Sequence, residues 1–258
     1  MTQTMTKEMS QVKPGAMQPM PDLLAVKGVS KQFLGLRAVD NVTLSVKKGE
    51  IISIIGPNGA GKTTFFNLLS GQLSPSEGEV HLRGDVINRL APHARAQLGI
   101  GRTFQIAKPL ITLSALENVM IGAFMRHARL TTARDKAMEV LQRVGLARHA
   151  LRRAGDLTLS ERRRLEVARA LALEPELVLL DEVMAGLNQS EVGQVIELLQ
   201  DLHANGLTFL IIEHNLKVVR AFSDRVVVLD RGRMIAEGSA EQILSSPEVI
   251  KAYLGDQQ

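Results

Sequence analysis

The sequence predicts an α/β fold, with a core of strands and helices and a mainly helical insertion. Short apolar or alternating segments, which are typical of strands, lie before residue 90 and again beyond residue 175. Between about residues 105 and 172 these signals fade, and apolar residues recur at helical spacing instead. This order is the one expected of an α/β core that carries an insertion.

The first part of the core is expected to lead into a glycine-rich turn. This turn begins at Gly56, and a helix is predicted over residues 63–69, ending near Gly71. Residues 78–87 predict a short strand pair with a turn at 83–85. The strands predicted before the glycine-rich turn are 24–29, 42–46 and 50–55.

Two helices are predicted in the insertion. The first covers residues 132–144, where one face is apolar, and the second covers 160–173, with Ser160 as its N-cap. Pro175 then ends the helical stretch. The elements predicted beyond it are strands at 177–180, 208–212, 225–230 and 233–237 and a helix at 190–203.

Length and composition fit one large domain, or one domain with an inserted subdomain. The first residues are rich in Met, Gln, Thr and Pro and lack the apolar stretch of a signal peptide. We therefore expect a disordered leader at 1–22 and a folded domain at 23–258, with a C-terminal tail at about 239–258. The absence of cysteine rules out a disulfide framework and is consistent with the reducing cytosol.

The charge balance does not favour a nucleic-acid partner. The 31 basic residues outnumber the 27 acidic ones only slightly, and aromatic residues, which stack on bases, make up 3% of the chain. Apolar runs such as 177–180 and 226–229 have the length of strands, whereas a bilayer span requires ~20 residues. The chain is therefore not expected to bind nucleic acid or to cross a membrane by itself.

A phosphate-binding loop follows the strand predicted at 50–55. The residues from Gly56 to Thr63 match the pattern G-x-x-x-x-G-K-[ST], with a strand before the loop and a helix after it. Glycines let successive backbone N–H groups converge on phosphate oxygens, and the helix N-terminus adds positive charge. Lys62 is expected to reach the β- and γ-phosphates of ATP, while the Thr63 hydroxyl binds Mg²⁺. The predicted nucleotide-binding residues of the loop are Gly56, Pro57, Asn58, Gly59, Ala60, Gly61, Lys62, Thr63 and Thr64.

Two carboxylates follow the strand predicted at 177–180. Asp181 and Glu182 are expected at the carboxyl edge of the sheet, where α/β proteins bind their ligands. Beside a phosphate loop, Asp181 is expected to hold Mg²⁺, and Glu182 to orient or deprotonate the attacking water. The alternative for this pair is two solvated acids at the end of a strand.

The order of these motifs resembles that of the ATP-binding cassette (ABC) ATPases. The shared landmarks after the phosphate loop are Gln105, the segment before the helix that carries Arg169, the Asp181-Glu182 pair and His214. The similarity covers nearly the whole chain after the leader, and it is greatest to the cassettes of branched-chain (hydrophobic) amino-acid importers. The segments that carry it are 56–67, 102–105, 117–119, 185–188, 212–215 and 247–255.

The resemblance implies a fold and several catalytic roles. The fold would be a RecA-like P-loop ATPase core with an antiparallel β subdomain and a helical subdomain at about 105–172. Phe33 would stack on adenine, and Gln105 would bind Mg²⁺ and sense the γ-phosphate. His214 would contact the γ-phosphate near Glu182. Taken singly, these residues also fit a core aromatic, a surface amide and a structural histidine.

One segment departs from the family pattern. Where the family carries L-S-G-G-Q, which caps the ATP of a partner cassette, residues 157–161 read Leu-Thr-Leu-Ser-Glu. Thr158 keeps the hydroxyl, and Ser160 is expected to offer another while narrowing the space for phosphate. Glu161 is expected to add negative charge, although the following helix still directs its N-terminus toward phosphate. These changes put the contact between cassettes and the turnover rate in question, but not ATP binding.

The resemblance also implies partners. Two cassettes, identical or paralogous, would enclose two ATP molecules, with Asn188 of each facing the other. The chain would lie on the cytoplasmic face of the cell membrane, bound to integral-membrane permeases and, through them, to a solute-binding protein. ATP-driven closure would pull the permeases and hydrolysis would reset them. The solute would be a branched-chain or other hydrophobic amino acid, with urea, amides and aromatic acids as alternatives.

Two other functions are compatible with a phosphate loop. A soluble cassette ATPase of translation or DNA repair usually carries two cassettes or a long coiled insertion, and this sequence has neither. A small-molecule kinase would need an acceptor pocket and an arginine-rich lid, and it would leave His214 unexplained. The sequence favours a transporter ATPase over both.

Overall fold

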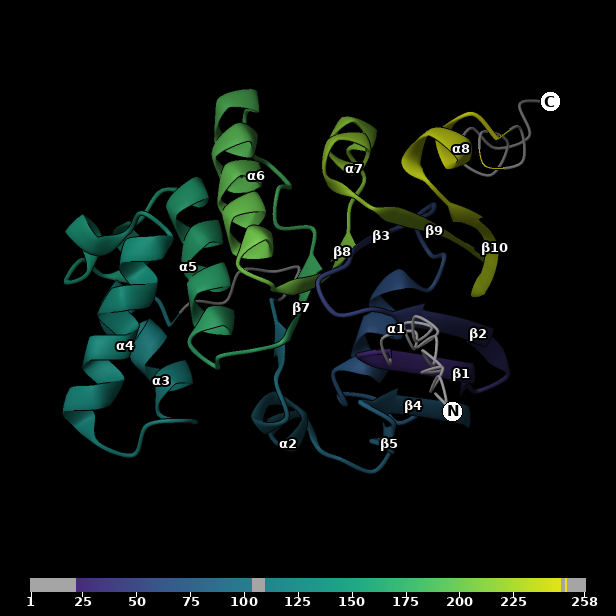
Figure 1. Ribbon diagram of the computed structural model, residues 1–258, viewed down its shortest axis with the longest axis horizontal. Helices are drawn as coiled ribbons and strands as arrows, with labels where there is room; N and C mark the ends of the chain where they lie inside the picture. Colours follow the sequence, from purple (N-terminus) through teal and green to yellow (C-terminus); the bar gives the residue numbers. More distant parts are fainter. Residues whose placement is uncertain (1–21, 104–109, 247–248, 250–258) are drawn as a thin grey trace, which may run out of the picture.

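The structure, a computed structural model, describes residues 22–103, 110–246 and 249. Nearly all of the predicted leader, much of the predicted C-terminal tail and Gln105 lie outside these residues. The described part contains two β-sheets and a group of helices, and the helical group and the smaller sheet lie at opposite ends (Figure 1). Within the described ranges, no helix is both long and apolar enough to span a bilayer.

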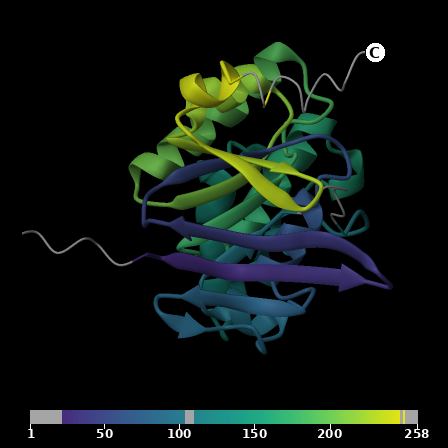
Figure 2. The ribbon, with the colours of Figure 1, turned by 90° about the vertical axis from the view of Figure 1, so that its right-hand side faces the viewer.

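A four-stranded antiparallel sheet is formed by segments from the first third of the chain. β1 and β2 make a long hairpin, seen in purple across the molecule in Figure 2, and β1 also pairs with β4. The order of the strands is β2-β1-β4-β5. They span β1 (Leu24–Phe33), β2 (Leu36–Val46), β4 (Glu77–Leu82) and β5 (Asp85–Val86).

A six-stranded sheet forms the core, in the order β10-β9-β3-β8-β7-β6. Its paired strands run parallel, except that β10 is antiparallel to β9. Every residue of β3, β7 and β8 is buried, as expected of parallel strands covered on both faces. The strands are β3 (Ile51–Ile55), β6 (Ile100–Arg102), β7 (Leu177–Asp181), β8 (Thr208–Ile212), β9 (Arg225–Asp230) and β10 (Arg233–Gly238).

Alternate residues of the core strands hold different layers against the sheet. Leu177 and Leu179 pack in one cluster with α1 and the antiparallel sheet, whereas Val178 and Leu180 pack with α6 and the helical group. Because burying one such side chain contributes roughly 1.5–3 kcal/mol, a single strand ties both layers together. The helices around the core sheet are α1 (Lys62–Leu69), α2 (Pro92–Gln97), α6 (Gln189–Ala204), α7 (Leu216–Phe222) and α8 (Ala240–Leu244).

From residue 110 onward, where the insertion is described, it folds into three α-helices and two short 3₁₀ helices. Helices α3 and α5 approach closely at Gly122, where a Cβ would lie 2.8 Å from the carbonyl oxygen of Arg169. A capping box begins α3: the Ser114 side chain accepts the Glu117 N–H, and the Glu117 carboxylate accepts the Ser114 N–H. The elements are α3 (Ala115–Ala123), α4 (Leu130–Arg143), η1 (Ala147–His149), η2 (Ala154–Asp156) and α5 (Leu159–Leu171).

The predicted elements are confirmed, with differences at their ends. The strands predicted at 208–212 and 225–230 occur at those residues, whereas β1 and β2 extend beyond the predicted strands. The predicted N-cap of the helix after residue 157 is wrong, because Thr158 rather than Ser160 caps it. Glu161 decides between them, since it stands three residues after Thr158 and completes a capping box with it.

Candidate nucleotide-binding and catalytic site

The phosphate loop occupies the turn between β3 and α1. Gly56, Gly59 and Gly61 have positive φ angles of 150°, 81° and 96°. A Cβ on Gly56 would lie 2.0 Å from the Leu229 carbonyl oxygen, and one on Gly61 would lie 2.2 Å from the Ala38 carbonyl oxygen. The loop can curl against its neighbours only because glycines stand at these positions, and the curl turns backbone N–H groups toward one point.

Lys62 closes the loop from within. Its Nζ donates hydrogen bonds to the carbonyl oxygens of Gly56 and Pro57 at 2.8 and 2.9 Å. The side chain is buried, and this burial lowers the pKa of Lys62, while the nearby carboxylates of Glu182 and Asp181 act in the opposite direction. The ammonium group is thus held inside the curl of the loop.

A cavity of about 550 Å³ lies against the loop. Glu182 reaches it from the end of β7, and Thr63 lies exposed near the start of α1. The predicted site residues that line the cavity are Asn58, Gly59, Ala60, Gly61, Lys62, Thr63, Thr64 and Glu182. The remaining lining residues, from the β1–β2 hairpin and the β9–β10 turn, are Leu36, Arg37, Ala38, Arg231 and Gly232.

Asp181, the last residue of β7, is fully buried. Its Oδ2 lies 3.4 Å from Nη2 of Arg102, and its Oδ1 has no hydrogen-bond partner among the described residues. Burial raises the pKa of Asp181, and the Arg102 guanidinium acts against that rise. Arg102 also donates to the side chains of Asn67 and Ser70 at 2.7 Å, so it ties Asp181 to α1.

Glu182 and His214 are joined by a hydrogen bond. Nε2 of His214 lies 2.7 Å from Oε1 of Glu182, and the Glu182 backbone N–H donates to the Ile212 carbonyl at 3.0 Å. Parallel pairing of β7 with β8 sets Asp181 opposite Ile212, so the residues that follow each strand meet at the carboxyl edge of the sheet. Glu182 has a φ of 51°, an uncommon conformation for a side chain of this size.

The family of the chain follows from comparison with known proteins. The family described as ABC transporter matches residues 39–185, and the family described as branched-chain amino acid ATP-binding cassette transporter matches residues 233–257. The chain belongs to the ABC transporter family. It is an ATP-binding cassette, and ATP hydrolysis is the activity characteristic of such cassettes.

Curated relatives match this cassette over most of their length. The high-affinity branched-chain amino acid transport ATP-binding protein LivG of Salmonella typhimurium is 40% identical over 253 residues, covering 91% of this chain and 98% of LivG. The protein of the same description named BraF, from Pseudomonas aeruginosa, is 39% identical over 252 residues, with the same two coverages.

Solved cassettes have the same fold. A nucleotide-free ATP-binding cassette from an ABC transporter is 32% identical, with a TM-score of 0.84 over 91% of this chain and 100% of that one. The cassette MJ0796, solved as a dimer in a post-hydrolysis state with ADP and Pi, is 30% identical, with a TM-score of 0.77 over 84% and 98%. These neighbours confirm the predicted RecA-like fold class with its two subdomains.

The altered segment of this cassette is engaged in capping its own helix. The Thr158 hydroxyl accepts the Glu161 N–H at 3.2 Å, and the Glu161 carboxylate accepts the Thr158 N–H at 2.8 Å. Oε1 of Glu161 also lies 3.1 Å from Nε2 of His149. Burial acts to raise the pKa of Glu161. The hydrogen bonds with Thr158 and the charges of His149 and Arg152 nevertheless hold this pKa below its ordinary value. Glu161 therefore bears its negative charge against groups of its own chain, and the expectation that this charge lies near a partner's phosphate stays a prediction.

Ser160 lies on the inner side of the same helix. Its side chain is 4% exposed, and its Oγ is buried without a hydrogen-bond partner among the described residues. The expectation that Ser160 offers its hydroxyl to a partner's phosphate therefore stays a prediction, and in this chain the hydroxyl is buried. Thr158 and Leu159 are the exposed residues at the helix start, and Leu159 approaches Gly186, where a Cβ would lie 3.1 Å from Leu159 Cδ2.

Two further predicted residues, Asn188 and Phe33, are not among the described residues that line the cavity. Asn188 is exposed and caps α6, accepting the Glu191 N–H at 3.0 Å. Phe33 is 41% exposed and lies under Lys31, whose Nζ is 5.3 Å from the ring centroid, but it is not among the described residues that line the cavity. Gln105 lies outside the described residues, so its role stays a prediction.

Proposed function

We propose that this cassette hydrolyses ATP to power the import of branched-chain or other hydrophobic amino acids through membrane permeases. The observation that carries the hydrolysis is that Glu182 lines the same cavity as the phosphate loop. The solute class is supported by the family match over residues 233–257 and by the names of the LivG and BraF relatives.

The phosphate loop is the proposed site for the β- and γ-phosphates of ATP. Its backbone N–H groups and the N-terminus of α1 supply hydrogen bonds to the phosphate oxygens. Lys62, now bonded to two loop carbonyls, exchanges these contacts for phosphate oxygens. The β1–β2 hairpin lines the same cavity through Leu36 and Ala38, so this side is the proposed place of the adenosine, with Phe33 beside it.

A Mg²⁺ ion fits the residues at the strand edge. Mg²⁺ prefers oxygen ligands and is usually held by one or two protein oxygens together with phosphates and water. Oδ1 of Asp181, which has no hydrogen-bond partner among the described residues, and the exposed hydroxyl of Thr63 are oxygens of this kind, and Gln105 is proposed to join them. When bound, the ion would neutralise charge on the phosphates during transfer.

Glu182 is the proposed general base or water-positioning group. Its carboxylate lies at the cavity and is oriented by the hydrogen bond from His214. A carboxylate in this position polarises a water molecule for attack on the γ-phosphate. His214 is exposed by 38% on the same edge, where its imidazole can also contact the γ-phosphate.

The second cassette of the assembly is proposed to be a paralogue that carries a complete signature. Thr158 is the exposed hydroxyl of the altered segment, since Ser160 is buried and the Glu161 carboxylate is held by Thr158 and His149. Such a segment offers the partner's phosphate little beyond Thr158 and the helix N-terminus. Asn188 is also exposed and is proposed to face the partner.

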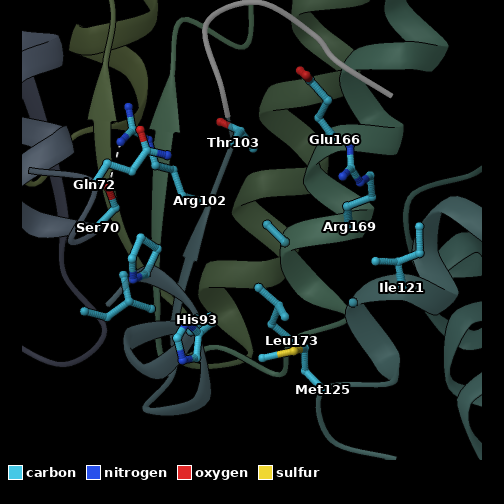
Figure 3. A pocket seen from close by; sticks show the side chains of 15 residues that line it. Ser70, Gln72, His93, Arg102, Thr103, Ile121, Met125, Glu166, Arg169 and Leu173 are labelled. Carbon is cyan, nitrogen blue, oxygen red and sulfur yellow. Dashed lines mark hydrogen bonds between the residues drawn. The ribbon is translucent and has the colours of Figure 1, made fainter. Parts of the chain in front are cut away.

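A groove between the core and the helical subdomain is the proposed docking place of a permease segment. Its cavity measures about 330 Å³ and lies between β6 and α2 on one side and α3 and α5 on the other (Figure 3). Apolar side chains such as Ile121, Met125 and Leu173 line it, together with Arg102 and Thr103. Docking there places the chain at the cytoplasmic face of the membrane, and the permeases connect it to a solute-binding protein.

Reconstitution with the permeases tests this function. The cassette pair, its permeases and a solute-binding protein are placed in proteoliposomes, and ATPase activity is measured with leucine, urea, an amide or an aromatic acid. Stimulation by leucine is the expected result. Stimulation by another solute alone would show that the proposed solute class is wrong, and failure of the cassette to co-purify with any permease would contradict the transport role.

A further inference from the structure

Arg102 is a buried arginine that lies between two parts of the proposed Mg²⁺ site. It is the last residue of β6, and its side chain is 7% exposed. Its Nη2 forms an ion pair with Oδ2 of Asp181 at 3.4 Å. Its Nη1 donates to Oδ1 of Asn67 and to Oγ of Ser70, at 2.7 Å each, and Figure 3 shows Arg102 beside Ser70. One guanidinium group therefore contacts both the end of β7 and the C-terminal end of α1.

The guanidinium group itself is held in place by α1. The ring of Phe66, a fully buried residue of that helix, has its centroid 5.9 Å from the guanidinium carbon of Arg102. The contacts with Asp181 and with α1 use two different nitrogens of one planar group, so neither side can shift without disturbing the other. The Asp181 carboxylate is thus placed relative to α1 through a rigid connection.

Pairing within the sheet does not make this connection. α1 follows β3, and β8 lies between β3 and β7 in the order of strands. Thr63 on α1 and Asp181 at the end of β7 therefore come from strands that are not neighbours. Asn67 stands four residues after Thr63, which is about one helical turn along the same face. By holding Asn67, Arg102 holds the part of α1 that carries the Thr63 hydroxyl.

We infer that Arg102 is a positioning residue for Mg²⁺, which fixes the Asp181 carboxylate relative to α1 so that Asp181 and Thr63 can bind the same ion. This inference rests on the proposed roles of those two residues as Mg²⁺ ligands. Arg102 engages Oδ2 of Asp181 and leaves Oδ1, which has no hydrogen-bond partner among the described residues, to face the ion. Arg102 has no acceptor for a cation, so it acts through Asp181 and α1.

Binding of Mn²⁺, which takes the same oxygen ligands as Mg²⁺, tests the inference without turnover. Electron paramagnetic resonance measures the Kd of Mn²⁺ for the full chain with a non-hydrolysable ATP analogue bound. Arg102→Ala should raise this Kd by about 10–100-fold, the loss typical when a residue that orients a metal ligand is removed. The Kd of the analogue in EDTA should stay near the wild-type value, because Arg95 still holds α1 through the carbonyl oxygens of Leu68 and Leu69.

Two further variants separate positioning from charge. Arg102→Lys keeps the positive charge but has a single nitrogen, which cannot reach Asp181 and α1 together. Its Kd for Mn²⁺ should therefore stay at least about fivefold above that of the wild type, within the effect expected of lost support for a ligand. Arg143→Ala removes an exposed arginine that lies 3.9 Å from Asp201, and as the control it should match the wild type. Full recovery of Mn²⁺ affinity in Arg102→Lys would overturn the inference, because charge alone would then suffice.

The other failures are distinguishable. Wild-type Mn²⁺ affinity in Arg102→Ala overturns the inference, and so does an equal loss of analogue affinity in EDTA, which would indicate a role in folding alone. Should Arg102→Ala not fold, Asn67→Ala, which removes one contact on α1 and leaves the ion pair with Asp181, must weaken Mn²⁺ binding at unchanged analogue affinity, or the inference fails. A wild-type chain that binds the analogue but no Mn²⁺ would instead overturn the proposed metal site and this inference with it.

Discussion

Two regions of the chain are built differently. One is the phosphate loop with the residues near it, where the chain is proposed to bind its own nucleotide. The other is the segment 157–161, which is proposed to meet the nucleotide of a partner. In the phosphate loop, Gly56 and Gly61 adopt backbone conformations in which a Cβ would collide with a neighbouring carbonyl oxygen. Glu182, which lines the cavity, is hydrogen-bonded to His214. In the segment 157–161, the polar groups are used inside the chain, since Thr158 and Glu161 cap their own helix.

This difference places the two proposed roles, binding the chain's own ATP and capping that of a partner, on separate groups of side chains. The proposed binding of ATP and Mg²⁺ needs groups that remain available to a ligand. The positive φ angles of the loop glycines and an Asp181 Oδ1 without a hydrogen-bond partner among the described residues fit this need. In the segment 157–161, a capping box and the contact with His149 instead satisfy the charged group of Glu161 within the chain. A cassette of this kind can be complete as a binder of ATP and incomplete as a cap for a partner.

Replacing Glu182 should have the largest effect on catalysis. Glu182→Gln keeps the shape of the side chain but not its ability to polarise water, so kcat should fall by about 10²–10⁴-fold. The Kd for ATP should stay near the wild-type value, because the phosphate loop is untouched. A single-turnover assay with radiolabelled ATP measures the rate, and turnover at the wild-type rate would show that another residue activates the water.

Replacing Lys62 should have the largest effect on binding. Lys62→Ala removes a cation from inside the phosphate loop, and hydrogen bonds to charged groups contribute about 1.5–3 kcal/mol each, so the Kd for ATP should rise by about 100-fold. Lys27→Ala, on the exposed part of β1, is a matched control and should bind ATP normally. Calorimetric titration compares the two, and unchanged affinity in a folded Lys62→Ala chain would contradict the assignment of this loop.

The elements around the motifs could be predicted because local sequence dictates them. The loop at Gly56 to Thr63 lies between a strand rich in isoleucine and a helix, and the strand at 208–212 contains the continuous apolar run 209–212. Elements such as β6, with 3 residues, and α7, with 7, are too short to show a period in the sequence. Their existence depends on pairing and packing with distant parts of the chain.

The supporting residues of the site could not be predicted from local patterns. Arg102 contacts Asp181 across 79 residues of sequence, because β6 and β7 pair side by side in the sheet. The motif residues are visible in the sequence, whereas the residues that orient them are set by the order of strands.

Removing the acidic member of the capping box should affect stability more than binding. Glu161→Ala loses the hydrogen bond with Thr158 and the contact with His149. Loss of a helix cap lowers the free energy of unfolding by about 1 kcal/mol, which corresponds to about 2–4 °C in melting temperature for a domain of this size. Glu117→Ala removes the same member of the box at α3, where the side chain has no comparable cation contact among the described residues, and should cost less. Differential scanning fluorimetry measures both, and equal shifts would show that His149 contributes nothing.

The smallest effect is expected at Ser160, and its size decides how the segment works. Ser160→Ala removes a buried hydroxyl that has no hydrogen-bond partner within the described structure, so melting temperature should stay unchanged or rise slightly. If the hydroxyl never reaches a partner's phosphate, ATPase activity of the assembled cassettes should stay within about twofold of the wild type. If it does reach the phosphate, the lost hydrogen bond would cost about 1.5–3 kcal/mol, which is a loss of tenfold or more in rate. Thr158→Ala, at the exposed position of the same segment, provides the contrast and should lower both stability and activity. A large loss of activity in Ser160→Ala at unchanged ATP affinity would mean that the start of α5 rearranges on assembly and exposes this hydroxyl. The segment would then act as a working signature, and the proposed need for a paralogous partner would fall.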